Sequence, residues 1–112
     1  MYALVNALSQ TTNLRVIAAV AHGSVPGAES SMLKIRGTEI RQEILSLIRR
    51  AMGPYALPFI EAAQYEGYAD APVGPKEAAT AAANYFNYRK LSIFGGSNEI
   101  QKNIISKMIL GL

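Results

Sequence analysis

Apolar residues recur every three or four positions along most of this chain, which is the pattern of helices that bury one face. No run of residues alternates between apolar and polar in the manner of a half-buried strand. The pattern therefore predicts an all-α fold, a bundle of about four helices within a single domain over residues 1–112. The expected helices cover about residues 3–22, 29–52, 76–94 and 98–110.

The second expected helix stops at Met52, because Gly53 is a typical helix stop and Pro54 cannot continue a helix. Its expected buried stripe consists of Met32, Leu33, Ile40, Ile44, Leu47, Ile48 and Ala51. Gly37 lies inside this helix, where glycine costs about 1 kcal/mol relative to alanine, so we expect another backbone to approach it closely. The apolar face expected for the last helix consists of Ile100, Ile104, Ile105, Met108 and Ile109.

Residues 54–75 are expected to form a long irregular segment, because they contain all but one of the five prolines. In a small domain such a segment is either a functional lid or a flexible connector, and both alternatives stay open. Its aromatic residues suggest that it packs against a substrate, a cofactor or its own core. They are Tyr55, Phe59, Tyr65 and Tyr68.

The composition fits a folded chain with one modest core, since half of the 112 residues are apolar. The absence of cysteine excludes disulfides and thiolate chemistry, and a single histidine argues against a transition-metal site with several ligands. No basic stretch followed by an apolar one opens the chain, and the longest strongly apolar run, residues 16–21, is too short to span a bilayer. We expect a soluble, cytoplasmic protein without membrane contact.

The net charge of +3 is unevenly distributed, with basic ends and an acidic middle. The two adjacent basic pairs, Arg49-Arg50 and Arg89-Lys90, fall in the last turns of expected helices, where cations favour the helix dipole. A nucleic-acid binder would instead gather its basic residues on one face. No nucleic-acid partner is therefore expected, whereas a small molecule that carries phosphate stays open.

Chemistry is expected at the junction between the last two helices. Gly95 and Gly96 free the backbone, and Ser97 is a typical N-cap residue that opens the final helix. The unpaired N–H groups of such a helix start can hold an anion or a cofactor oxygen. Glycines and serine between two helices more often form only a turn, so the pattern alone favours that interpretation, and the anion site stays the open alternative.

Motifs spread over nearly the whole chain from about Ala7 carry a specific family resemblance. They are Ser31-Met32-Leu33-Lys34, Thr38-Glu39, Ala51-Met52-Gly53-Pro54, Tyr85-Phe86-Asn87-Tyr88-Arg89, the run from Ile93 to Ile105 with Phe94-Gly95-Gly96-Ser97-Asn98-Glu99-Ile100-Gln101 at its centre, and Ile109-Leu110-Gly111-Leu112. In this order and spacing they resemble the C-terminal helical domain of the acyl-CoA dehydrogenases. The resemblance implies an α,β-dehydrogenation of acyl-CoA thioesters in which a carboxylate removes the α-proton and FAD accepts the hydride.

The resemblance also implies that the chain is incomplete. Full-length members add an N-terminal helical domain and a middle β domain, bind FAD, and form dimers or tetramers. The present chain ends where the family ends but has no counterpart for the first helix of the C-terminal bundle. An apolar groove left by that helix is expected to find a partner, so the isolated chain is expected to self-associate or exchange helices.

The resemblance assigns the turn to the cofactor rather than to catalysis. In many members the base is a glutamate at the position of Gly95, and glycine cannot abstract a proton. The base then lies upstream in a longer parent, or the parent is a subunit that binds partners without catalysing. The family turn contacts the adenosine and pyrophosphate part of FAD, so Gly96, Ser97, Asn98 and Glu99 are cofactor-side candidates. Glu99 is also a candidate substitute base, although the helix dipole and the Ser97 cap already explain an acid there.

Residues 50–54 resemble the segment that reaches the FAD of a neighbouring subunit, which makes Arg50 and Gly53 further cofactor-side candidates. Pro54 replaces a second glycine of that segment and offers no N–H. No catalytic or metal-binding residue is expected. Two functions stay open: an FAD-contacting, oligomerising part of an acyl-CoA dehydrogenase, or a non-catalytic helical scaffold. Under both, the isolated chain is expected to be inactive and to bind no FAD alone.

Overall fold

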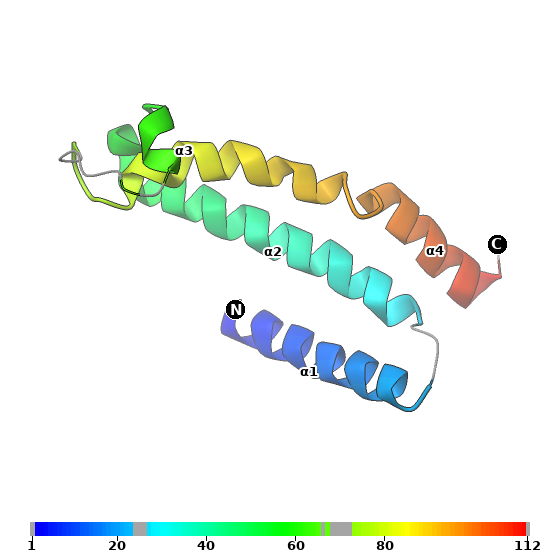
Figure 1. Cartoon of the computed structure of the whole chain (residues 1–112). Coiled ribbons are helices and arrows are strands. Elements are labelled where there is room, and N and C mark those ends of the chain that lie inside the picture. The colour runs from blue at the N-terminus through cyan, green and yellow to red at the C-terminus, as the bar shows by residue number, and fades with distance from the viewer. Residues whose placement is uncertain (1, 24–26, 66, 68–72, 112) are drawn as a thin grey trace. The chain divides into compact units, whose positions relative to one another are not determined.

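A computed structural model of the chain describes residues 2–23, 27–65, 67 and 73–111. This part consists of helices without any strand, which confirms the all-α fold class. The α-helices and 3-10 helices (η) are α1 Tyr2–Ala21, α2 Ala28–Met52, η1 Gly53–Ala56, η2 Glu61–Gln64, α3 Ala78–Asn87, η3 Tyr88–Ser92 and α4 Asn98–Leu110 (Figure 1). Within these residues no helix is long and apolar enough to cross a membrane.

The chain divides into two compact units, which we call the terminal unit and the central unit. The terminal unit combines residues 1–39 with residues 91–112, and the central unit comprises residues 40–90. Helix α2 runs through both, so its first half belongs to the terminal unit and its second half to the central unit. The candidate turn before α4 lies in the terminal unit.

Polar rather than apolar side chains are the most buried ones on the α2 part of the terminal unit. Ser31 and Thr38 are 5% and 6% exposed. The Thr38 hydroxyl lies 2.8 Å from the Lys34 carbonyl oxygen, one turn earlier in α2, and 3.4 Å from the Leu91 carbonyl oxygen. The contact with Leu91 joins the segment that leads toward α4 to α2.

The central unit is built on small side chains. Helix α3 buries Ala78, Ala79, Ala81 and Ala82, and it packs against η1, where Ala56 is 1% exposed. Alanine combines the highest helix propensity with the smallest side chain other than glycine, which explains both the helix and its close packing.

The helix expected over residues 76–94 changes character before its predicted end. The α-helix stops at Asn87 and the chain continues as the 3-10 helix η3 to Ser92. The N–H of Tyr88 is shared between the carbonyl oxygens of Asn84 and Phe86 at the end of α3. A tighter last segment replaces the expected α-helical turns.

Most of the predicted buried stripes are exposed. On α2, Met32, Ile44, Leu47 and Ile48 are 38% to 50% exposed, and Leu45, which was not predicted, is buried. The aromatic residues of the segment after η1 are exposed as well, apart from Tyr68, which lies outside the described residues. The close approach expected at Gly37 is wrong, since a Cβ there would meet nothing within 4 Å. The apolar pattern therefore predicted the helices correctly, but most of their apolar faces are not covered by other parts of the described chain.

Candidate functional site: the turn before α4

The turn between η3 and α4 depends on two glycines in the left-handed region. Gly95 has φ +69° and Gly96 φ +81°, which other residues adopt only at a cost. Ser97 then returns to extended backbone, with φ −60° and ψ 159°, as expected for an N-cap residue. The glycine pair and the serine therefore interrupt the preceding helix and start α4 by local conformational preference alone.

Hydrogen bonds close the turn onto the first turn of α4. The Ser97 hydroxyl oxygen accepts from the Ile100 N–H at 3.3 Å, and the Ser97 carbonyl oxygen accepts from the Gln101 N–H at 2.9 Å. The Gln101 side-chain amide reaches back and donates to the Gly95 carbonyl oxygen at 3.3 Å. The capping role predicted for Ser97 is thus present in the structure.

Several backbone donors of the turn have no acceptor among the described residues. They are the N–H groups of Gly96, Ser97 and Asn98, which take part in none of the hydrogen bonds found there. Gly95 and Gly96 are exposed, and the Gln101 side-chain amide lies against Gly96. The start of α4 can therefore offer neighbouring N–H donors, reinforced by the helix dipole, to an anion or a cofactor oxygen.

Glu99 follows in the first turn of α4 and is fully ionised at neutral pH. Its own backbone N–H and then the Ser97 hydroxyl hydrogen-bond the carboxylate and lower its pKa. Desolvation opposes this shift, and the nearby Lys102 and Lys34 each add a smaller lowering effect. A carboxylate with a lowered pKa is a poorer proton acceptor than one poised near neutral pH. The arrangement suits a capping and charge-setting role better than that of a base.

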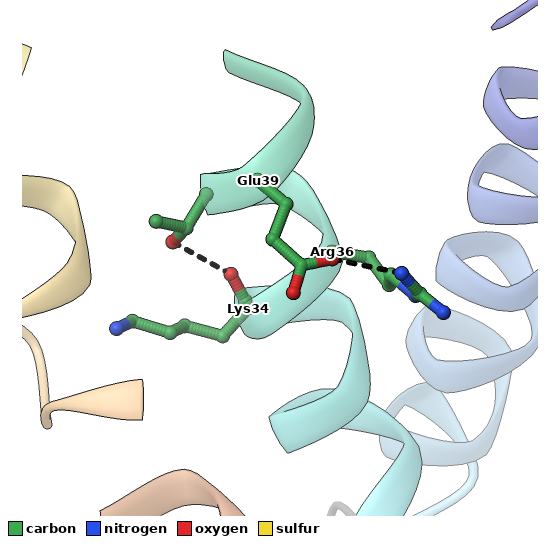
Figure 2. A network of polar contacts seen from close by, with 4 residues as sticks. Lys34, Arg36 and Glu39 are labelled. Atoms are coloured by element: carbon green, nitrogen blue, oxygen red, sulfur yellow. Dashed lines mark hydrogen bonds and ion pairs between the residues drawn. The ribbon is translucent and has the colours of Figure 1, made fainter. Parts of the chain in front are cut away.

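Lys34 of α2 joins the turn through Asn98. Its ammonium group donates to the Asn98 side-chain carbonyl oxygen at 3.0 Å, across 64 positions of sequence. In Figure 2, Lys34 and Arg36 extend to opposite sides of α2, and Arg36 forms an ion pair with Glu39. From the sequence, Lys34 is only a member of the Ser31–Lys34 motif, because no sequence signal links a lysine to an asparagine so far along the chain.

Arg50 and Gly53 belong to the central unit, whereas the turn residues belong to the terminal unit. Arg50 is an exposed cation in the last turn of α2, and Gly53 opens η1 with φ +54°. Pro54 occupies the first turn of η1, where its missing N–H leaves one donor fewer for a ligand.

The central unit contains a cluster of arginine and tyrosine side chains that the sequence did not predict. The guanidinium carbons of Arg49 and Arg89 lie 4.7 Å and 4.4 Å from the Tyr85 ring centroid, and that of Arg41 lies 4.6 Å from the Tyr88 centroid. The Arg49 Nε is buried and has no hydrogen-bond partner among the described residues. The Tyr85–Arg89 motif contains three of its members, but no local sequence pattern predicts that Arg41 and Arg49 of α2 contact them.

The described residues include no group of three or more His, Cys, Asp or Glu side chains that could hold a metal ion. A separate pocket of about 350 Å³ lies in the terminal unit between the second half of α1 and the start of α2. Arg15, Val16 and Glu29 are among its lining residues, and none of the predicted site residues lines it.

The family model for the acyl-CoA dehydrogenase C-terminal domain matches residues 1–110. The chain belongs to this family. Searches of curated proteins and of solved structures give no significant match. The match covers both compact units, so the acyl-CoA dehydrogenase C-terminal domain includes the turn before α4 as well as the central unit.

Proposed function

We propose that this chain is the C-terminal, FAD-contacting and oligomerising part of an acyl-CoA dehydrogenase. The observation that carries the proposal is the turn before α4, where Gly96, Ser97 and Asn98 offer N–H groups without a protein acceptor in the described chain. Family membership supplies the context, since acyl-CoA dehydrogenases generally depend on FAD.

The residues of the turn fit the adenosine and pyrophosphate part of FAD. Phosphate oxygens are anionic acceptors, and adjacent backbone donors at a helix start suit them. The lowered pKa of Glu99 keeps a negative charge at the same end of α4, which opposes an anion on that side of the turn. Glu99 thus favours a ligand approach along the exposed Gly95 and Gly96 backbone.

FAD, when bound, would supply the hydride acceptor for α,β-dehydrogenation of an acyl-CoA thioester. This chain's own residues would bind and orient it, without removing the substrate proton. Gly95 has no side chain, and Glu99 has a lowered pKa that makes it a weak base. We therefore infer that the catalytic base lies outside this chain, and that the isolated chain is inactive.

Arg50 and Gly53 are included in the proposal as contacts to the FAD of a neighbouring subunit. An exposed guanidinium at the end of α2 suits a phosphate, whereas Pro54 limits the backbone donors beside Gly53. The acyl-CoA substrate, the role in fatty acid metabolism, the cytoplasmic location, and the absence of nucleic-acid or membrane partners all stay predictions.

The proposal is tested by FAD titration of the complete flavoprotein that contains this domain, followed by flavin fluorescence. Ser97→Ala and Gly96→Ala should both weaken FAD binding, because the first loosens the start of α4 and the second forces a side chain into the left-handed region. Ser106→Ala, farther along α4, is the matched control and should leave FAD affinity unchanged. Unaltered FAD affinity in both turn variants would refute the cofactor role.

Oligomerisation is supported by the exposed apolar side chains of α4. Ile100, Ile104 and Met108 repeat at intervals of four and are 52%, 37% and 54% exposed, while Ile109 is 63% exposed. A continuous apolar stripe on a small domain normally marks an interface. We expect light scattering to find oligomers of the 112-residue chain at micromolar concentration. A well-folded monomer would contradict this.

The alternative is a helical scaffold without catalysis. The same exposed apolar residues favour it, because a scaffold would pack them against a partner without needing a cofactor. The visible spectrum of the complete protein separates the two functions. Bound flavin gives a yellow preparation, and a colourless, well-folded protein would favour the scaffold.

A further inference from the structure

The turn before α4 is held from two sides. Gln101 ties it to α4 by donating to the Gly95 carbonyl oxygen, and Lys34 ties it to α2 by donating to Asn98 at 3.0 Å. The two glycines between these ties have the largest conformational freedom to lose, so a turn made of them needs such ties to keep one geometry.

The contact between Lys34 and Asn98 is strong by its chemistry. It is a charge-assisted hydrogen bond, and Lys34 and Asn98 are both half-buried, which screens it less than a surface pair. It joins residues 64 positions apart, so it constrains how α4 starts relative to the first half of α2 within the terminal unit. Thr38, one turn later in α2, adds a longer contact to the Leu91 carbonyl oxygen.

Helix electrostatics do not explain a lysine at this place. An ammonium group near a helix start faces the positive end of the dipole, which favours anions instead. Lys34 contributes to the lowered pKa of Glu99, but Lys102 has a larger effect on that group. The contact with Asn98 is therefore the feature that accounts for Lys34.

We propose that Lys34 is a positioning residue for the cofactor: through Asn98 it fixes the first residue of α4, so that the N–H groups of Gly96, Ser97 and Asn98 keep one direction. This inference rests on the proposed role of the turn in FAD binding. It assigns to α2 a part in cofactor binding, without contact between Lys34 and the flavin.

The test uses the complete flavoprotein and two measurements. Lys34→Met removes the ammonium group and keeps the length of the side chain, and Asn98→Ala removes its acceptor. Each should weaken FAD affinity by about fivefold to tenfold, which is less than the usual contribution of a hydrogen bond to a charged group, because the pair is only half-buried. In the flavin-free protein, the amide hydrogens of Ile100 and Gln101, which are hydrogen-bonded to Ser97, should exchange faster in both variants.

The controls distinguish the loss of the hydrogen bond between Lys34 and Asn98 from the mere loss of a positive charge. Lys102→Met removes a positive charge that also acts on Glu99 but forms no contact with Asn98, and it should leave both measurements unchanged. Lys34→Arg should restore most of the affinity. The double variant Lys34→Met with Asn98→Ala should be no weaker than the weaker single variant, because both remove one interaction.

The outcomes distinguish this inference from the proposed function. If Ser97→Ala weakens FAD binding while Lys34→Met and Asn98→Ala do not, the positioning role of Lys34 is wrong and the role of the turn stands. If these variants and Gly96→Ala all leave FAD affinity unchanged, both are wrong. Equal effects of Lys34→Met and Lys102→Met, or unchanged amide exchange of Ile100 and Gln101, would also overturn the positioning role. Should Lys34→Met fail to fold, Asn98→Ala and Lys34→Arg decide the question.

Discussion

Replacing Ser97 by alanine should loosen α4 without disturbing the other helices. The Ser97 hydroxyl oxygen is the acceptor for the Ile100 N–H, and the hydroxyl also hydrogen-bonds the Glu99 carboxylate. The substitution leaves a helix-start donor without its acceptor and removes a donor to a charged group. Both effects act at the first turn of α4, where the Glu99 carboxylate, once the Ser97 hydroxyl is gone, accepts only from its own N–H and cannot replace the Ser97 acceptor for Ile100.

The size of the effect follows from the geometry. An N-cap replaced by alanine costs about 0.5 to 2 kcal/mol of stability. The Ser97 contact is 3.3 Å long, beyond the usual N–H···O distance, which places it in the lower half of that range. We therefore expect α4 to lose about 1 kcal/mol, which corresponds to about a fivefold change in an opening equilibrium.

Amide hydrogen exchange along α4 measures this opening directly. The amides of residues 102–106 should exchange about two to five times faster in Ser97→Ala than in the unchanged protein. Ser97→Asp should restore protection, since aspartate caps equally well and favours the dipole. Ser106→Ala is the matched control in the same helix, where alanine has the higher helix propensity and protection should stay equal or rise. Equal effects of the two alanine variants would refute the capping argument.

Further predictions concern the pH dependence, the glycines and the alanine packing. The folded pKa of Glu99 is lowered, so its stabilising contribution is present above the usual glutamate pKa of about 4.3 and is lost as pH falls through the lower folded value. The difference in melting temperature between the unchanged protein and Glu99→Gln should therefore shrink on acidification below that range, and a pH-independent difference would count against it. Gly96→Ala should destabilise the protein by about 1–2 kcal/mol, because Gly96 has a φ of +81°. Gly37→Ala should stabilise it by up to about 1 kcal/mol, because Gly37 lies in a regular helix and a Cβ there would meet no atom within 4 Å. Urea denaturation measures both changes in the free energy of unfolding, and changes of the same sign would contradict this prediction. Ala81→Leu should overpack the central unit and lower the free energy of unfolding by about 1–3 kcal/mol in the same assay. Ala83 is only half-buried, so Ala83→Leu should lower it less. Equal losses would show that α3 does not pack as described.

The sequence by itself determined the helical fold class and much of the candidate turn. Local preferences were sufficient for these features: Gly53 ends α2 with a positive φ, the two glycines before α4 do the same, and Ser97 caps the helix with its own hydroxyl. Each of these effects acts within a few residues, so the amino-acid pattern contains nearly all the information. The family resemblance that these motifs indicated is confirmed over residues 1–110.

Tertiary structure alone decided which faces are covered and which distant residues meet. The stripe around Ile44 and Ile48 has the spacing of a buried face, yet burial requires a neighbour to lie on it, and spacing cannot show whether one does. The sequence pattern also predicted one continuous α-helix through Tyr88, whereas the structure changes there to a 3-10 helix. The hydrogen bond from Lys34 to Asn98 depends on the packing of α2 with the start of α4 in the terminal unit, because their positions in the sequence are too far apart for any local preference to join them.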